Sequence, residues 1–264
     1  MFSFKRGPRR MRLRDLIIHC QIVAACCLVT GPARADDEWA VGLGGTHYSQ
    51  AGNSDLVSFG FKHSVITGGE FIGVERTQFQ TGSLLLLDLD AFQKPTADRA
   101  WSEGISVGTA NVAPSRYEVY KVRLAFDASL NSHWSARAVE QYIKADAVYG
   151  NLLIVGIEFQ PIRAWGVKLA AGQSFAGTLA DRHGEFAIHC DGKVHVVAGL
   201  VVGTTGYDPI MLGERVTRSA LREPYVGVSA ALRGGTLSLS AESLRLGGST
   251  RDTLRMRYTR QLRQ

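Results

Sequence analysis

Hydrophobic and polar residues alternate along most of the chain after residue 36, at the period of two that is typical of β-strands. In the clearest segment, 120–127, aliphatic and aromatic residues alternate with Lys121, Arg123 and Asp127. Weaker versions of the same pattern occur at 39–44, 57–62, 165–170, 194–202 and 254–259. We find no segment of a dozen residues with the 3.6-residue period of an amphipathic helix. The sequence therefore predicts an all-β chain.

The length of these segments favours strands that cross a membrane. They run for about 9 to 13 residues, which is the length a tilted strand needs to span a bilayer, whereas strands of soluble proteins are commonest at about 5 or 6 residues. Glycine pairs such as Gly68-Gly69 and Gly234-Gly235 indicate turns between them. A strand and turn together would take about 17 to 20 residues, so the sequence predicts about 12 strands. Irregular composition predicts longer loops at 93–102, 109–116 and 204–223.

The first 35 residues have the three parts of a secretory signal peptide. Residues 5–14 are basic, residues 16–30 are mostly apolar, and Ala33-Arg34-Ala35 has the small residues that signal peptidase accepts. We therefore predict a cleaved signal peptide at 1–35 and one β-barrel domain at 36–264. An alternative is a lipid anchor, because residues 23–26 resemble a lipobox in which Cys26 would be lipidated.

Charge and cysteine content follow this division of the chain. The formal net charge is +6, but seven of the 30 basic and one of the 24 acidic residues lie in the leader, which leaves 23 of each sign after residue 35. The mature chain is thus neutral overall, and we expect no nucleic-acid partner. Only Cys190 lies outside the leader, so an intramolecular disulfide is excluded in the mature chain.

Taken together, the basic leader, the acidic start at 36–38, the long two-faced strands and the alternating segment 254–262 near the C-terminus resemble Gram-negative outer-membrane β-barrels. The likeness extends loosely to barrels associated with exopolysaccharide export. It implies a single antiparallel transmembrane β-barrel in the outer membrane, with outer-membrane lipid and the barrel-assembly machinery as partners and an export complex as a further candidate. One departure is that such barrels commonly end in an aromatic residue, whereas Leu262 stands at that place and is followed by Arg263-Gln264.

Aromatic residues give this interpretation a further test. Amphipathic rings favour the membrane interface, although aromatics also favour strands in general. Six of them fall near expected strand ends: Trp39, Tyr48, Trp134, Tyr142, Trp165 and Tyr225.

In a barrel, the polar face of the alternating strands would line the lumen. The charged residues assigned to this face are Lys121, Arg123, Asp127, Arg137, Lys168, Arg255 and Arg257. Such residues would bias a channel toward anions, or hold the lumen together through pairs of opposite charge. The sequence therefore predicts a channel, or a structural or export component, for small solutes or a polysaccharide.

Two other functions fit parts of the sequence. A soluble or lipid-anchored periplasmic β-sheet protein that binds a ligand would show the same alternation. A lipid-modifying barrel enzyme would need a serine next to a histidine in space, for which Ser64 and Ser132 are candidates beside His63 and His133. Neighbours on a strand point to opposite faces, so neither pair can react by itself.

Metal-ligating residue types gather around the turn at Asp191-Gly192, where they are His183, His189, Cys190 and His195. A three-residue turn would pair His189 with Lys193 and place Cys190 in the turn, and the spacing matches no established metal site. Asp88 and Asp90 share one face, where solvated charge is the simplest role. We therefore predict no catalytic residue, no metal and no cofactor.

Overall fold

In the computed structural model the described residues are 37–49, 52–65, 68–80, 82–96, 98–112, 115–145, 148–176, 179–205, 219–246 and 249–262. The expected signal peptide and Cys26 lie outside them. These residues form fourteen strands: β1 (Glu38–Tyr48), β2 (Gly52–Val65), β3 (Gly68–Gln78), β4 (Gly82–Thr96), β5 (Arg99–Val112), β6 (Ser115–Ser129), β7 (Trp134–Ala145), β8 (Val148–Ile162), β9 (Trp165–Ala176), β10 (Leu179–Cys190), β11 (Val194–Thr205), β12 (Ser219–Leu232), β13 (Gly235–Leu246) and β14 (Ser249–Gln261). None of the described residues belongs to a helix long and apolar enough to span a membrane.

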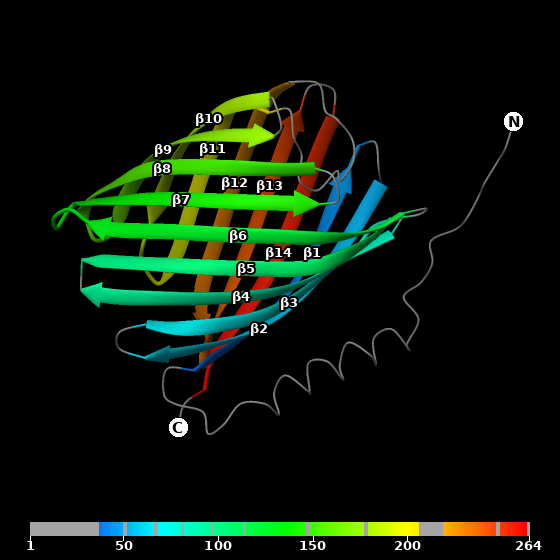
Figure 1. Cartoon of the computed structure of the whole chain (residues 1–264). Helices are drawn as coiled ribbons and strands as arrows, with labels where there is room; N and C mark the ends of the chain where they lie inside the picture. Colours follow the sequence, from blue (N-terminus) through cyan, green and yellow to red (C-terminus); the bar gives the residue numbers. More distant parts are fainter. Residues whose placement is uncertain are drawn as a thin grey trace, which may run out of the picture.

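The strands form one closed antiparallel barrel. Each strand pairs with its neighbours in the sequence, and β1 closes the sheet by pairing with β14, from Glu38 opposite Gln261 to Tyr48 opposite Arg251 (Figure 1). Closure satisfies the backbone hydrogen bonds that edge strands would leave unpaired. Both chain termini of the sheet lie at one rim, which we call the terminal end; the opposite rim is the distal end.

The barrel has 14 strands, so the prediction of about 12 was too low. Strands of 11 to 15 residues are joined by short connections, for example two residues at Arg233-Gly234 and four at 130–133. Arg233 and Gly234 both have positive φ, as the tight two-residue hairpin turn requires. The estimate of 17 to 20 residues per strand and turn failed because it assumed longer connections.

Two of the three expected long loops are hairpins. Strand β4 continues to Thr96 and β5 resumes at Arg99; β5 in turn ends at Val112, and β6 begins at Ser115. The 93–102 segment resembles a loop in sequence because Pro95 cannot donate a backbone hydrogen bond to a neighbouring strand. In the structure, the β4–β5 register shifts at the same place, between Gln93 and Thr96. The third expected loop, at 204–223, lies largely outside the described residues. Its last part, from Ser219 onward, belongs to strand β12.

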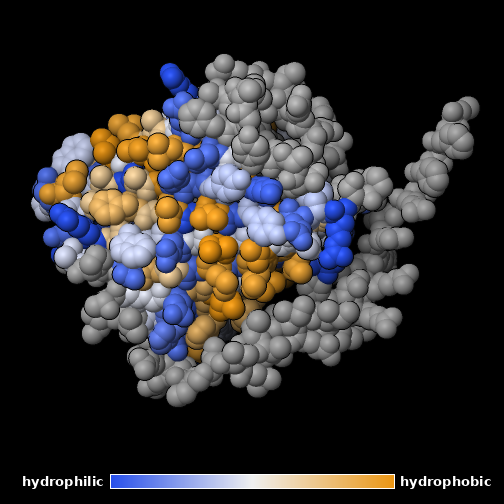
Figure 2. Space-filling model, in the orientation of Figure 1, coloured by the Kyte–Doolittle hydropathy of each residue, from blue (hydrophilic) through white to orange (hydrophobic). Residues whose placement is uncertain are grey.

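Alternation gives the barrel an apolar outer face. On β6 the residues Val122, Leu124 and Phe126 are 40, 49 and 47% exposed, and equivalent side chains of β4, β8 and β14 are exposed to a similar degree. Figure 2 shows hydrophobic side chains, interspersed with polar ones, on the outside of the barrel wall. So much exposed aliphatic surface is typical of a barrel whose outer solvent is lipid.

All four tryptophans of the chain lie at the terminal end. Trp39, Trp101, Trp134 and Trp165 are each within the first three residues of an odd-numbered strand, and every odd-numbered strand begins at that end. Trp134 stacks on Phe159, and Trp39 meets Tyr258 edge to face, with ring centroids 4.6 and 5.7 Å apart. Sequence inspection missed Trp101 because it fell in an expected loop. It wrongly placed Tyr225 near a strand end, whereas that residue lies within β12.

Candidate functional site

On β4 and β6 the inner face of the barrel changes from apolar to charged along the strand. Strand β4 starts at the distal end, and its inner residues are Leu84 and Leu86, followed by Asp88 and Asp90. On β6, which starts at the same end, Tyr117 and Val119 precede Lys121 and Arg123 in the same way. Because inner positions recur at every second residue, this order gives β4–β6 an apolar zone at the distal end and a charged zone next to it.

The apolar zone of β4–β6 contains a small cluster of buried side chains. Ala110 and Val119 are buried there and are covered by Leu84, Leu86 and Tyr117. Other buried side chains at distal strand ends are Tyr48, Leu244 and Leu246. These apolar side chains line part of the distal end; on other strands the same end holds the buried carboxyl of Asp181 and the ion pairs of Arg251 with Glu223 and Glu242.

The charged zone surrounds a cavity of about 240 Å³ between β1–β6 and β14. Three of its cationic and three of its anionic lining residues oppose one another: Lys121, Arg123, Arg257, Glu75, Asp88 and Asp90. Arg123 donates to Asp90, with 3.0 Å between Nη2 and Oδ1. Charge in this cavity is therefore balanced.

The facing wall carries a second charged group. Lys168 Nζ lies 2.9 Å from both carboxylate oxygens of Glu185. The Tyr225 hydroxyl donates to Glu185 Oε1 over 2.5 Å. Glu185 is thereby held by neighbours on β9 and β12, which gives this wall a fixed polar surface.

Five of the seven residues expected to line the lumen lie in or beside the charged cavity or in the facing-wall group, and the other two form a separate pair. Lys121, Arg123 and Arg257 line the cavity, and Arg255 precedes Arg257 by two residues on the same face of β14. Lys168 belongs to the facing wall. Arg137 and Asp127 pair with each other toward the terminal end, with 3.5 Å between Nε and Oδ1 and about half of each side chain exposed. Their role in solute passage stays a prediction.

Sequence inspection missed the carboxylates that these cations meet. The alternation of Leu84, Leu86, Asp88 and Asp90 was a usable signal, but it predicted only solvated charge. Glu185 is 17 residues from Lys168, and nothing but the strand register brings the two together.

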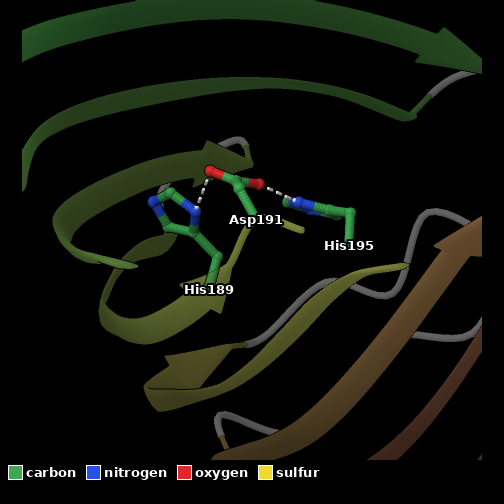
Figure 3. Close-up of side chains that lie close together, drawn as sticks. All are labelled: His189, Asp191 and His195. Atoms are coloured by element: carbon green, nitrogen blue, oxygen red, sulfur yellow. Dashed lines mark hydrogen bonds and ion pairs between the residues drawn. The ribbon is translucent and has the colours of Figure 1, made fainter. Parts of the chain in front are cut away.

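A histidine cluster lies at the β10–β11 hairpin, at the terminal end (Figure 3). His189 Nδ1 lies 3.2 Å from Asp191 Oδ2, and His195 Nδ1 donates to Asp191 Oδ1. His189 pairs with Val197, so the expected pairing with Lys193 was wrong, and Cys190 is the last residue of β10 and not part of the turn. Asp191, which sequence inspection treated only as a turn residue, joins the two histidines.

Asp191 lies in the connection between the strands, where its carboxylate is well supplied with donors. Besides His195, Gln160 donates to the carboxylate, with 3.2 Å between Nε2 and Asp191 Oδ2. The backbone N–H of Asp191 donates to the carbonyl oxygen of Ala164, which fixes the residue in place. The hydrogen bond from His195 lowers the pKa of the Asp191 carboxyl below its ordinary value, against the raising effect of partial burial. A group held as an anion between two imidazoles attracts protons or metal ions.

The serine candidates are not part of a catalytic arrangement in the described residues. Ser64 Oγ is buried without a hydrogen-bond partner, while His63 Nδ1 lies 2.5 Å from Asp37 Oδ1. His133 Nδ1 lies 3.1 Å from the Gln160 carbonyl oxygen in an exposed turn. Neither histidine is positioned to activate its neighbouring serine.

No family model matches the chain, and no curated protein matches it. Solved structures do. The CymD monoaromatic hydrocarbon channel aligns with a TM-score of 0.64 at 8% identity, over 88% of this chain and 90% of that one. The Ralstonia pickettii toluene transporter TbuX aligns with a TM-score of 0.63 at 9% identity, over 87% and 90%. The P. putida toluene transporter TodX aligns with a TM-score of 0.59 at 8% identity, over 88% and 91%.

At such low identity the likeness concerns the fold. The chain is a closed, antiparallel, 14-stranded β-barrel of the same overall architecture as these channels, and it covers nearly their whole length. These neighbours are channels and transporters rather than enzymes.

Proposed function

We propose that this protein is an outer-membrane channel for small solutes that have an apolar part. Its outer face supports the membrane location: exposed aliphatic side chains cover mid-strand positions, and four tryptophans mark one rim. In a membrane-spanning barrel, such rings lie at the level of the lipid headgroups.

The observation that carries the solute class is the division of the inner face of β4–β6 into an apolar and a charged zone. Leu84, Leu86 and Val119 offer an apolar surface at the distal end, while the cavity deeper inside holds charges of both signs in equal number. A lumen lined with one sign of charge would select ions of the other sign, whereas a balanced lumen has no such preference. The names of the neighbouring structures, which refer to monoaromatic hydrocarbons and toluene, agree with this class of solute. An export role for a polysaccharide stays a prediction from the sequence.

The location is tested by the mobility of the protein in SDS gels. Protein in washed outer membranes should run differently before and after boiling, because a closed barrel stays folded in SDS until it is heated. Recovery in the soluble fraction with one heat-independent band would contradict a membrane barrel.

The channel is tested in proteoliposomes by osmotic swelling with arabinose, with and without benzyl alcohol as a small amphipathic competitor. We expect faster swelling than in empty liposomes, and slower swelling once benzyl alcohol occupies the apolar zone. The double variant Leu86→Ser, Val119→Ser should weaken this inhibition. The control variant Leu85→Ser should not, because Leu85 lies on the exposed outer face of β4, the strand that carries Leu86. Folded protein that swells liposomes no faster than the empty control would overturn the channel, and swelling that benzyl alcohol leaves unchanged would overturn the class of solute.

A further inference from the structure

Three potential ligands converge at the β10–β11 hairpin. His189, Asp191 and His195 each offer one donor atom, and these atoms all lie within 4.8 Å of one another (Figure 3). The cluster lies apart from the charged cavity between β1–β6 and β14, and the proposed passage of solutes makes no use of it.

His189 is held in one orientation by two carboxylates. Its Nε2 lies 3.0 Å from Glu158 Oε1, and its side chain is only 13% exposed. A carboxylate at this distance favours the ring proton on Nε2, which leaves a lone pair on Nδ1. Histidines that ligate metals are commonly oriented by a carboxylate on the other nitrogen in this way.

The other nitrogen of His189, Nδ1, faces the Asp191 carboxylate. Nδ1 is buried, and its contact with Asp191 Oδ2, 3.2 Å away, has the distance of an ion pair but poor hydrogen-bond geometry. With the ring proton on Nε2, the lone pairs of Nδ1 and Oδ2 repel each other unless a second proton or a metal ion lies between them. Tetrahedral ligands at about 2.0 Å from a metal are themselves about 3.3 Å apart, so the observed separation suits a shared ion.

We propose that His189, Asp191 and His195 bind one divalent transition-metal ion of the Zn²⁺ type, which displaces the proton that His195 donates to Asp191, with Glu158 orienting His189. Two imidazoles and a carboxylate form a nitrogen and oxygen ligand set that suits zinc, cobalt and nickel, and water would complete the coordination. Gln160 holds the Asp191 carboxylate from the side through Oδ2. The site closes the β10–β11 hairpin at the terminal end, independently of what the lumen transports.

Cobalt is the direct probe, because Co²⁺ replaces Zn²⁺ and absorbs visible light when it is bound. Folded protein purified in detergent should take up one Co²⁺ per chain, without the thiolate charge-transfer band that cysteine ligands would give, and Zn²⁺ should displace it. His195→Asn and Asp191→Asn should each weaken binding at least 100-fold, and Glu158→Gln by about 10- to 100-fold. His183→Asn is the matched control, since His183 lies on the same face of β10 outside the cluster.

Heat-dependent gel mobility shows that each variant is folded. A second measurement uses the unaltered protein: Zn²⁺ should protect His189 and His195 from diethylpyrocarbonate but leave His133, in the exposed turn of the same rim, unprotected. Absent or non-stoichiometric Co²⁺ uptake, unchanged binding in folded His195→Asn, a thiolate band, or equal modification with and without Zn²⁺ would each overturn the site and leave a proton-bridged cluster.

Discussion

The two faces of strand β6 differ in how they vary along its length. Outside, Val122, Leu124 and Phe126 repeat one chemistry, while inside the strand runs from Val119 through Lys121 and Arg123 toward the terminal end. The outer side chains meet one solvent throughout the thickness of a bilayer, so a uniform apolar face is stable there. The inner face meets water, ions and solute, and its chemistry changes with depth. In this fold, specificity is therefore expected inside, and membrane stability outside.

The largest effect is expected on the outer face. Leu124→Arg should lower the free energy of unfolding in lipid vesicles by roughly 2 to 4 kcal/mol, because it places a charge in hydrocarbon near the middle of the strand. Urea titration followed by tryptophan emission measures the loss. Glu118→Arg, at the distal end of the same face, should cost only about 0 to 1 kcal/mol. Equal small effects would mean that water, and not lipid, covers Leu124, which is 49% exposed.

A smaller effect is expected where the inner face is tightly packed. A Cβ at Gly104 would come within 1.8 Å of Asp90 Oδ1, so Gly104→Ala must push that carboxylate away from Arg123. Since the Asp90 side chain can rotate, the cost in unfolding free energy should be about 1 kcal/mol, at the low end of overpacking. Gly184→Ala, whose Cβ would have no atom nearer than 3.8 Å, should be close to neutral. If the two variants unfold alike, the packing of Asp90 against Arg123 has no energetic weight.

The smallest effect on stability should accompany a clear effect on selectivity. Arg257→Glu leaves two cations and four anions among the six charges named above in the cavity, so the reversal potential in a salt gradient should shift toward cation selectivity. We expect less than about 1 kcal/mol of change in unfolding, because the arginine is solvated. Arg260→Glu, on the outer face of the same strand, should leave the reversal potential unchanged. A matching shift in both variants would show that the inner cavity does not determine selectivity.

The alternation of the sequence predicted the faces of single strands better than their number or partners. Residues 120–127 showed a two-faced strand directly, because side chains two residues apart on a strand share a face whatever it pairs with. The hairpins at 93–102 and 109–116 were missed, because prolines and small residues there look like loops when only the local sequence is considered. Trp101 lies in the first of these hairpins, so the sequence did not show that all four tryptophans lie at the terminal end.

The candidate sites were harder to predict than the strands. The cationic residues were visible in the alternation, but their partners were not: Lys168 meets Glu185, and Arg123 meets Asp90, 33 residues away. The histidines were recognisable by residue type, but their acidic partners were not. Asp191 meets His189 through the β10–β11 hairpin, and Glu158 meets it from β8, two strands away in the sheet.

By itself, the sequence determined an all-β chain with long two-faced strands, because alternation is a local property of the backbone. Only the tertiary structure decided that there are fourteen strands and that β1 pairs with β14. It also brought charges of both signs together around the cavity, and the histidines and Asp191 together at the β10–β11 hairpin. Contacts between strands depend on register and closure, which are settled by the whole sheet at once and leave no mark in any single segment.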